Sequence, residues 1–192
     1  MNKIKMLIVE DDPVWMKCLS DYIGKENDMT VVKQAYTKEE ALQVNCSNID
    51  VALMDLSLSS EDVDLSGLEV AEHLNSKGLE KIIMLTSWDA PEIILESFDK
   101  GAINYITKSS YKDIPKAIRD AYCDKVSLHS DVSGVLIKEL RFERKAKPLT
   151  PAEREVYELK EQGLTKNQIA QKLFKSVETI KKQFRMINKK IK

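Results

Sequence analysis

The chain has 192 residues, of which 43% are hydrophobic and 32% are charged, a balance that excludes a disordered protein and suits a folded globular one. Its formal net charge of −1 conceals an asymmetry, because residues 149–192 carry 11 Lys and Arg against 5 Asp and Glu, whereas residues 1–148 carry 19 against 26. The length suits one ordinary domain with a small second one, and the basic end is a reason to look for nucleic acid there.

Cysteine, histidine and apolar segments argue against several other classes of protein. Cys18, Cys46 and Cys123 are far apart and odd in number, so we expect reduced, buried thiols. His73 and His129 are equally isolated, which argues against a zinc site. The start of the chain, MNKIKMLIVEDD, has too short an apolar run for a signal peptide, and no segment approaches a membrane-spanning length. We therefore expect a cytoplasmic protein that does not contact a membrane.

Residues 1–124 alternate between short apolar runs and longer amphipathic stretches. The apolar runs, each read as a buried strand, are Met6–Val9, Thr30–Ala35, Val51–Met54, Ile82–Leu85 and Asn104–Thr107. The stretches with helical spacing are Val14–Ile23, Lys38–Asn45, Leu68–Asn75, Pro91–Lys100 and Lys112–Cys123. Such alternation predicts an α/β domain, a five-stranded doubly wound parallel sheet of the flavodoxin-like type with helices on both faces.

Local signals mark the ends of these helices. Thr37 followed by Glu40 is a capping box for the second one. Gly24 and Gly101 stand where a helix commonly ends on a left-handed residue.

The remaining residues divide into a linker and a small helical domain. Residues 125–147 contain a helical pattern, Val132–Phe142, and are expected to form a helix-containing linker. Residues 148–192 carry three helix starts: Thr150 with Pro151 and Glu153, Thr165 with Gln168, and Ser176. Gly163 ends the first of the three helices. Three short helices with a tight turn between the last two predict a helix-turn-helix domain.

Polar residues follow the predicted strands at their carboxyl ends, where open parallel sheets collect functional groups. They are Glu10, Asp11, Asp12, Asp55, Thr86, Ser87 and Lys108. Clustered carboxylates repel one another unless a cation relieves them, and oxygen ligands suit Mg²⁺. A carboxylate can also act as a nucleophile on phosphorus if a metal, a lysine and a hydroxyl stabilise the phosphoryl oxygens. Taken singly, Asp12 before Pro13 is better explained as a helix N-cap.

The motifs IVEDD, LMDLSL, MLTS and YITK, in this order, resemble those of response-regulator receiver domains over about residues 4–124. The resemblance implies Asp55 as the phosphoacceptor and Mg²⁺ as the cofactor, held by Glu10, Asp11, Asp55 and the carbonyl of Ser57. It also implies Thr86 and Tyr105 as switch residues and Lys108 as the lysine that pairs with the phosphate. The loop Ser59–Ser66 is longer than is usual in the family, and its role stays open.

The last predicted helix carries a basic outer face. Its inward positions share one narrow arc and are Val177, Ile180, Phe184, Ile187 and Ile191. The segment LTPAEREVYEL…GLTKNQIAQKLFKSVETIKKQF resembles the LuxR/NarL-type DNA-binding domain over about 40 residues. That resemblance implies Thr165–Leu173 as the scaffold helix and Val177–Lys190 as the recognition helix. The implied DNA-binding residues are Lys181, Lys182, Arg185 and Lys189.

These patterns lead to one functional prediction and leave two alternatives. We expect a two-component response regulator in which a sensor histidine kinase phosphorylates Asp55, which then controls binding to double-stranded DNA and transcription. We expect no enzymatic activity other than phosphotransfer to the chain's own aspartate and its dephosphorylation. Relatives usually continue into a fourth helix that mediates dimerisation, and the sequence up to Lys192 shows no pattern for it. Phosphorylation is therefore expected to pair two chains through the receiver, over about residues 90–123. The alternatives are a Mg²⁺-dependent phosphatase or phosphotransferase with an external substrate and an adaptor that works without phosphorylation.

Overall fold

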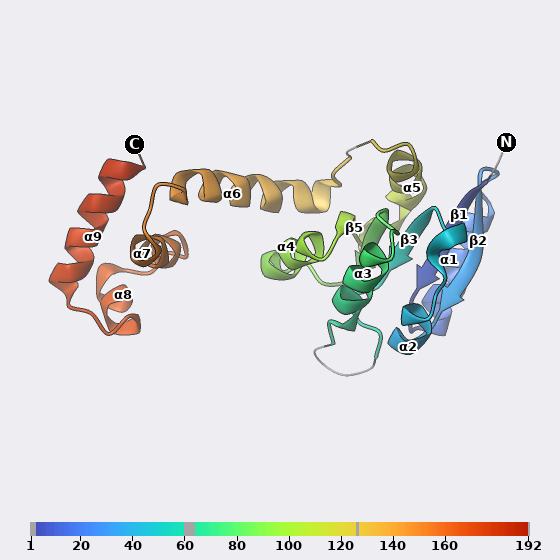
Figure 1. Cartoon of the computed structure of the whole chain (residues 1–192), viewed down its shortest axis with the longest axis horizontal. Helices are drawn as coiled ribbons and strands as arrows, with labels where there is room; N and C mark the ends of the chain where they lie inside the picture. The colour runs from blue at the N-terminus through green and yellow to red at the C-terminus, as the bar shows by residue number, and fades with distance from the viewer. Residues whose placement is uncertain (1–2, 60–63, 126, 192) are drawn as a thin grey trace. The chain divides into compact units, whose positions relative to one another are not determined.

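The computed structural model describes residues 3–59, 64–125 and 127–191, and the chain divides into two compact units, residues 1–136 and 137–192 (Figure 1). The predicted loop Ser59–Ser66 therefore lies in part outside the described residues. Within the described ranges, no helix is both long and apolar enough to cross a bilayer.

The first unit is built on a parallel sheet of five strands in the order β2-β1-β3-β4-β5. The strands are β1 (Ile4–Val9), β2 (Met29–Ala35), β3 (Val51–Met54), β4 (Ile82–Thr86) and β5 (Ala102–Thr107). All four pairs of neighbouring strands are parallel. The predicted fold class is thus confirmed, and each strand overlaps the run of residues predicted for it.

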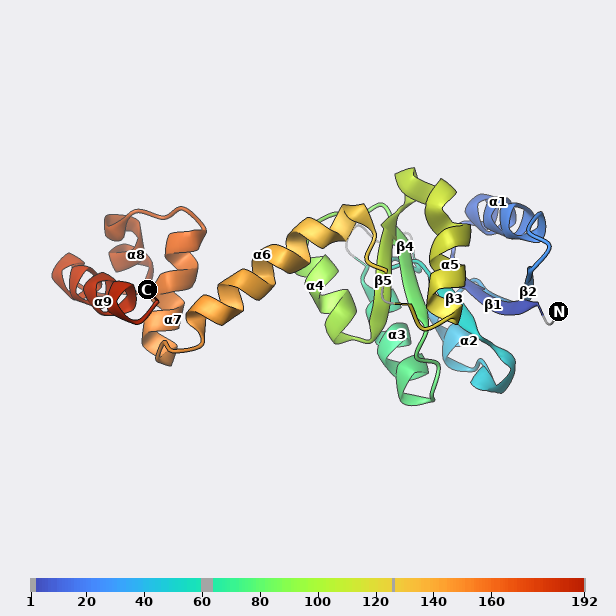
Figure 2. The ribbon, with the colours of Figure 1, turned by 90° about the horizontal axis from the view of Figure 1, so that it is seen from above.

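Helices cover both faces of this sheet (Figure 2). They are α1 (Pro13–Gly24), α2 (Lys38–Leu42), α3 (Ser66–Ser76), α4 (Pro91–Asp99) and α5 (Ile114–Tyr122). Alternate strand residues point to opposite faces, so Met6 and Ile8 pack with α1 and α5, whereas Leu7 and Val9 pack with α2, α3 and α4. Two short 3₁₀ segments, η1 (Cys46–Asn48) and η2 (Lys108–Asp113), also belong to the unit.

Two local predictions in this unit need correction. Helix α2 ends at Leu42 rather than Asn45, because the Asn45 side chain accepts a hydrogen bond from the Ser47 amide at 3.0 Å and opens η1 instead. Gly24 is the last residue of α1 and has no positive φ; the helix is capped by Lys25 in the right-handed region. Gly101, by contrast, has the predicted left-handed conformation, with φ of 97°.

The cysteines are free, as predicted, but their expected burial is wrong for two of them. Cys18 and Cys123 are exposed, and Cys46 is half-buried. Cys18 falls outside the buried stripe of α1, which consists of Met16, Leu19 and Ile23. Cys123 caps α5, beyond the last residue that faces the sheet.

The capping signals are reproduced with one change of partner. The Thr37 hydroxyl accepts the Glu40 amide at 3.2 Å, as predicted, but the Glu40 carboxylate accepts the Tyr36 amide rather than that of Thr37. The Asp12 carboxylate caps α1, accepting the Val14 amide at 2.7 Å. Asp12 is therefore a structural cap.

The second unit is a small bundle of helices. They are the last turns of α6 (Ser130–Ala146), then α7 (Pro151–Glu161), α8 (Lys166–Lys172) and α9 (Val177–Lys190). Both predicted capping boxes are present, Thr150 with Glu153 and Thr165 with Gln168, and Ser176 caps α9. A shared core holds the bundle together, in which the Phe142 and Tyr157 rings stack with centroids 5.2 Å apart.

Candidate functional site

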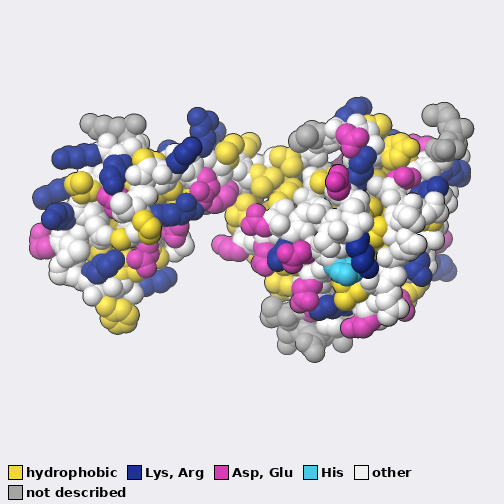
Figure 3. All heavy atoms as spheres, in the orientation of Figure 1, with side chains coloured by type: hydrophobic (Ala, Val, Ile, Leu, Met, Phe, Trp, Pro, Cys, Tyr) yellow, Lys and Arg dark blue, Asp and Glu magenta, His cyan; other side chains and the backbone are white. Residues whose placement is uncertain are grey.

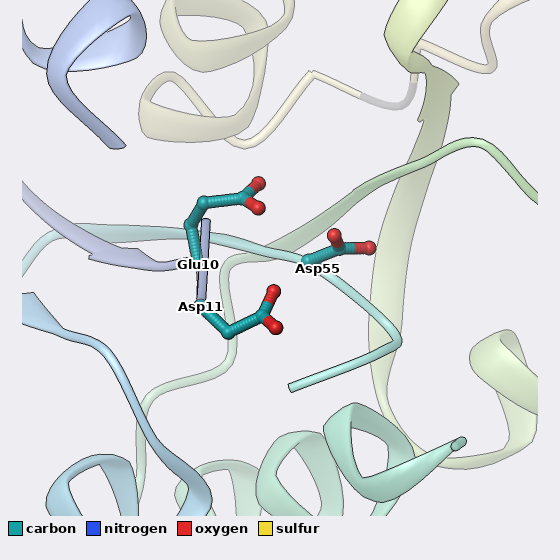
Figure 4. A group of neighbouring side chains, drawn as sticks. All are labelled: Glu10, Asp11 and Asp55. Atoms are coloured by element: carbon teal, nitrogen blue, oxygen red, sulfur yellow. The ribbon is translucent and has the colours of Figure 1, made fainter. Parts of the chain in front are cut away.

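Three carboxylates meet at the carboxyl edge of the sheet. Glu10 and Asp11 directly follow β1, and Asp55 directly follows the neighbouring β3, so the parallel pairing brings them to one place. Each offers an oxygen, and these atoms lie within 4.8 Å of one another (Figure 4). Glu10 and Asp55 are buried, with 1% and 6% of their surfaces exposed. The sequence prediction that these residues gather is confirmed.

The backbone around Asp55 is tightly held. Its amide donates to the Val9 carbonyl at 2.9 Å, and one of its carboxylate oxygens accepts the Leu56 amide at 2.7 Å. Gly67, in the first turn of α3, donates its amide to the Leu56 carbonyl at 2.8 Å. A β-carbon on Gly67 would lie 2.1 Å from the Asp55 carbonyl oxygen. Only glycine lets α3 approach this turn so closely.

Lys108 supplies the cation of the site. Its Nζ lies 2.7 Å from Asp55 Oδ2 and 2.8 Å from Glu10 Oε2, and only 11% of its side chain is exposed. The same Nζ lies 5.0 Å from the centroid of the Trp15 ring, a cation–π distance. Trp15 was not expected in the site from the sequence, because its helical spacing fits a residue that simply packs on the core.

Negative charge exceeds positive charge in this cluster, and the acid–base properties show it. Burial raises the pKa of Glu10 to about 7, and the charge of Asp55 adds to this while Lys108 opposes it. Burial and then Asp55 also raise the pKa of Asp11. Burial works against the charge of Lys108, but its hydrogen bonds to Asp55 and Glu10 outweigh burial and raise its pKa. One lysine thus leaves repulsion that a divalent cation would relieve, and three carboxylates are ligands that suit Mg²⁺.

The two predicted switch residues are buried beside this cluster and share a partner. Thr86 ends β4 and accepts the Trp88 amide at 3.4 Å, while the Tyr105 hydroxyl donates to the Trp88 carbonyl at 2.6 Å. Tyr105 is fully buried, and burial raises its pKa. The backbone of Trp88 therefore links the ends of β4 and β5.

The segment after Asp55 contains a residue that the sequence prediction missed. Asp64 accepts the Leu58 amide and the Ser66 amide, both at 2.8 Å, and so joins the start of α3 to the chain that follows the acidic cluster. An acid two residues before a helix was the available signal. Ser57 is half-buried, its hydroxyl donates to the Ser59 carbonyl at 3.0 Å, and its role as a metal ligand stays a prediction.

The second candidate site is the outer face of α9. The predicted inward face is confirmed, with Ile180 and Ile187 buried. Lys182, Arg185 and Lys189 are exposed and, among the described residues, form no ion pair. Lys181 differs from them, because its Nζ lies 2.6 Å from a carboxylate oxygen of Glu178. Lys and Arg side chains are prominent on the surface of the second unit, residues 137–192 (Figure 3).

Comparisons with known proteins match both parts of the chain. The family model of the response regulator receiver domain matches residues 6–119, and that of the luxR family of bacterial regulatory proteins matches residues 147–192. The chain is 32% identical to the uncharacterized transcriptional regulatory protein YvfU of Bacillus subtilis (strain 168), an alignment that covers 98% of this chain and 90% of that protein. It is 28% identical to the nitrate/nitrite response regulator protein NarL of Escherichia coli (strain K12), covering 97% and 88%.

Solved structures show the same architecture. The chain is similar to the two-component response regulator RcsB in a complex with DNA, with a TM-score of 0.66 and 25% identity over 99% of this chain and 92% of that one. The receiver model alone covers more than half of this chain, and the luxR-family model covers the helical unit. The chain therefore belongs to the response regulator family, as a two-component transcriptional regulator with a receiver domain and a luxR-family DNA-binding domain.

Proposed function

We propose that Asp55 is the phosphoacceptor of this regulator and that a sensor histidine kinase is the donor. The observation that carries the proposal is the position of Lys108 Nζ, 2.7 Å from Asp55 Oδ2, in a buried acidic cluster. In the transfer, Asp55 Oδ2 forms a bond to phosphorus while the bond from phosphorus to the donor nitrogen breaks. The electron pair stays on the imidazole, which takes a proton from water, and Lys108 shares the charge of the phosphoryl oxygens.

The same cluster is the proposed magnesium site. Glu10, Asp11 and Asp55 would hold the ion, with the Ser57 carbonyl as a further ligand, and Mg²⁺ would supply positive charge against the phosphoryl oxygens. Thr86 would donate its hydroxyl to one of these oxygens. We propose no external substrate: the chain would catalyse only phosphoryl transfer to and from its own Asp55.

The proposed output is DNA binding through α9. Two recognition helices on neighbouring half-sites give more affinity than one, because the second contact becomes intramolecular. We propose that phosphorylation favours a homodimer through the receiver face formed by α4, β5 and α5, on which Ile103 and Tyr122 are each 40% exposed. Phosphorylation would then raise DNA affinity by making two copies of α9 act together.

The metal role is tested with the full chain, acetyl phosphate and Mg²⁺, and intact-mass spectrometry of the product. Asp11→Ala is expected to slow labelling about tenfold or more, because the loss of a group that only hydrogen-bonds to a metal ligand already weakens metal sites on this scale. Its melting temperature should not fall, because removing a carboxylate relieves repulsion in the cluster.

The adjacent acid is the matched control. Asp12→Ala removes the cap of α1 and should lower stability by about 1 kcal/mol while labelling like the parent. If Asp11→Ala labels at the parental rate in Mg²⁺, Asp11 does not hold the metal.

The DNA-binding face is tested by charge removal on α9. Lys182→Ala and Arg185→Ala should each weaken binding to a duplex that the parent chain has selected from a random-sequence pool. Loss of a base contact would cost about 1–3 kcal/mol. Loss of a phosphate contact would reduce the slope of log affinity against log salt by about 0.9. Labelling of Asp55 should be unchanged in both variants.

Two other lysines serve as comparisons. Lys160→Ala removes the same charge from α7 and should bind as the parent does. Lys181→Ala should have a smaller effect than Lys182→Ala, since Lys181 already pairs with Glu178. If Lys182→Ala and Arg185→Ala both bind as tightly as Lys160→Ala, α9 is not the recognition helix.

A further inference from the structure

The first turn of α6 is part of the receiver unit. Val132 is fully buried in the core that lies under α2, α3 and α4. One residue earlier, Asp131 Oδ2 accepts the Thr107 hydroxyl at 2.7 Å and the Thr107 amide at 3.1 Å. The first turn of α6 is therefore attached to the receiver unit by the buried Val132 side chain and by the hydrogen bonds of Asp131 with the end of β5.

Thr107 directly precedes Lys108, so its hydrogen bonds with Asp131 restrain the backbone next to the lysine. The Thr107 hydroxyl also lies 2.8 Å from the Ser109 hydroxyl, on the other side of Lys108. Although burial works against its charge, hydrogen bonds from Thr107 and Ser110 lower the pKa of Asp131. Asp131 is thus a charged acceptor that holds Thr107 directly, and the Thr107 hydroxyl in turn contacts Ser109 on the other side of Lys108.

A second attachment fixes the same stretch of chain. The His129 amide donates to the buried Asn104 side chain at 3.1 Å, and the His129 ring lies 3.0 Å from the Asp113 carboxylate. The Asn104 oxygen also accepts the Tyr105 amide at 2.9 Å. The start of α6 is consequently bonded to β5 and to the far end of η2, on both sides of Lys108.

We propose that Asp131 is a positioning residue for Lys108, so that the first turn of α6 is coupled to the phosphorylation state of Asp55. The inference rests on the proposed role of Asp55 as phosphoacceptor. When a phosphoryl group arrives, Lys108 must leave part of its pairing with Glu10 and Asp55 to meet the new oxygens. The movement of Lys108 displaces its neighbour Thr107 and so changes the hydrogen bonds between Thr107 and Asp131. Because coupling between two sites is reciprocal, a change that frees the first turn of α6 from Thr107 also makes the position of Lys108 less fixed.

The first test is the rate of phosphorylation of the full chain at saturating acetyl phosphate and Mg²⁺. Asp131→Asn is expected to lower this rate about fivefold or more, the lower end of couplings between linked sites. Mg²⁺ affinity measured by titration calorimetry should stay unchanged, because Glu10, Asp11 and Asp55 are untouched. Asp99→Asn, the same change at an exposed residue of α4, should behave as the parent does.

Conservative variants and a double-mutant cycle separate positioning from general damage. Thr107→Ser keeps the hydroxyl and should label normally, whereas Thr107→Val loses it and should resemble Asp131→Asn. In a Lys108→Ala background, Asp131→Asn should cause no further loss, because it acts through the lysine. Additive losses in that background would overturn the proposal.

Amide hydrogen exchange measures the reverse effect, that of phosphorylation on the first turn of α6. Acetyl phosphate should change the protection of residues 129–136 in the parent chain and leave it unchanged in Asp131→Asn. A parent that takes up no phosphoryl group would refute the phosphoacceptor proposal itself. A parent that labels well, with Asp131→Asn labelling equally fast, would refute only the positioning role.

Discussion

The Asp55→Asn variant is expected to take up no phosphoryl group from acetyl phosphate and to show no phosphorylation-dependent gain in dimer formation or DNA affinity. An amide has nearly the shape of a carboxylate but is not a nucleophile toward phosphorus, and it leaves Glu10 as the charged partner of Lys108. The fold should survive, because the amide oxygen can still accept the Leu56 hydrogen bond of 2.7 Å. Mass spectrometry, sedimentation and a DNA-shift assay measure the three losses.

Asp50→Asn is the matched control for this change. Asp50 lies just before β3, at the opposite end of the strand from Asp55, and accepts the Lys5 amide at 2.8 Å. This variant should label and bind DNA as the parent does. Undiminished labelling of Asp55→Asn would place the phosphoacceptor elsewhere. If the parent gains DNA affinity on phosphorylation but stays monomeric, relief of inhibition within one chain would replace dimerisation as the mechanism.

The Gly67→Ala variant is expected to lose the most stability of the changes considered. The new β-carbon would lie 2.1 Å from the Asp55 carbonyl oxygen and 2.8 Å from the Leu56 α-carbon. These are backbone atoms of the turn that follows β3, which the hydrogen bond from the Asp55 amide to the Val9 carbonyl holds in place, so relief requires α3 to move away from the turn. We expect a loss of about 3 kcal/mol or more in the free energy of unfolding. Urea unfolding followed by circular dichroism measures it.

Gly24→Ala provides the contrast. Gly24 lies in the last turn of α1, and a β-carbon there would meet nothing within 4 Å. Alanine should therefore stabilise the unit by about 0.5–1 kcal/mol, because it restricts the unfolded chain. Parental stability of Gly67→Ala would contradict the close packing of α3 on the Asp55 turn.

The parts of this molecule that could be predicted from sequence are those governed by short-range patterns. Val51–Met54 is a strand with the predicted bounds, since a short apolar run buried on both faces has few alternatives. The bounds of α9, Val177–Lys190, are equally as predicted, with Ser176 as a strong cap. The meeting of Glu10, Asp11 and Asp55 followed from one rule, that parallel strands end at a common edge.

Other features depend on which distant residues meet, and the sequence held no signal of comparable strength. Trp15 has the spacing of a packing residue, and only the fold brings its ring over Lys108. Asp131 reads as an acid in the first turn of a linker helix, although its partner Thr107 lies 24 residues away. The error at Cys18 arose because residue type was weighed without the direction in which that position of α1 faces, and the error at Gly24 because the helix ends on Lys25 in a right-handed conformation that needs no glycine.

The positions of Trp15 and Trp88 confine tryptophan fluorescence to the receiver unit. These are the two tryptophans of the chain, and residues 137–192 contain none. The indole of Trp15 lies against the Lys108 ammonium, and the carbonyl of Trp88 accepts the Tyr105 hydroxyl. Emission from the indoles therefore originates beside the acidic cluster and the switch residues, while the helical unit contributes no indole signal. The natural protein thus carries its own fluorescent reporter of receiver chemistry, free of background from the DNA-binding unit.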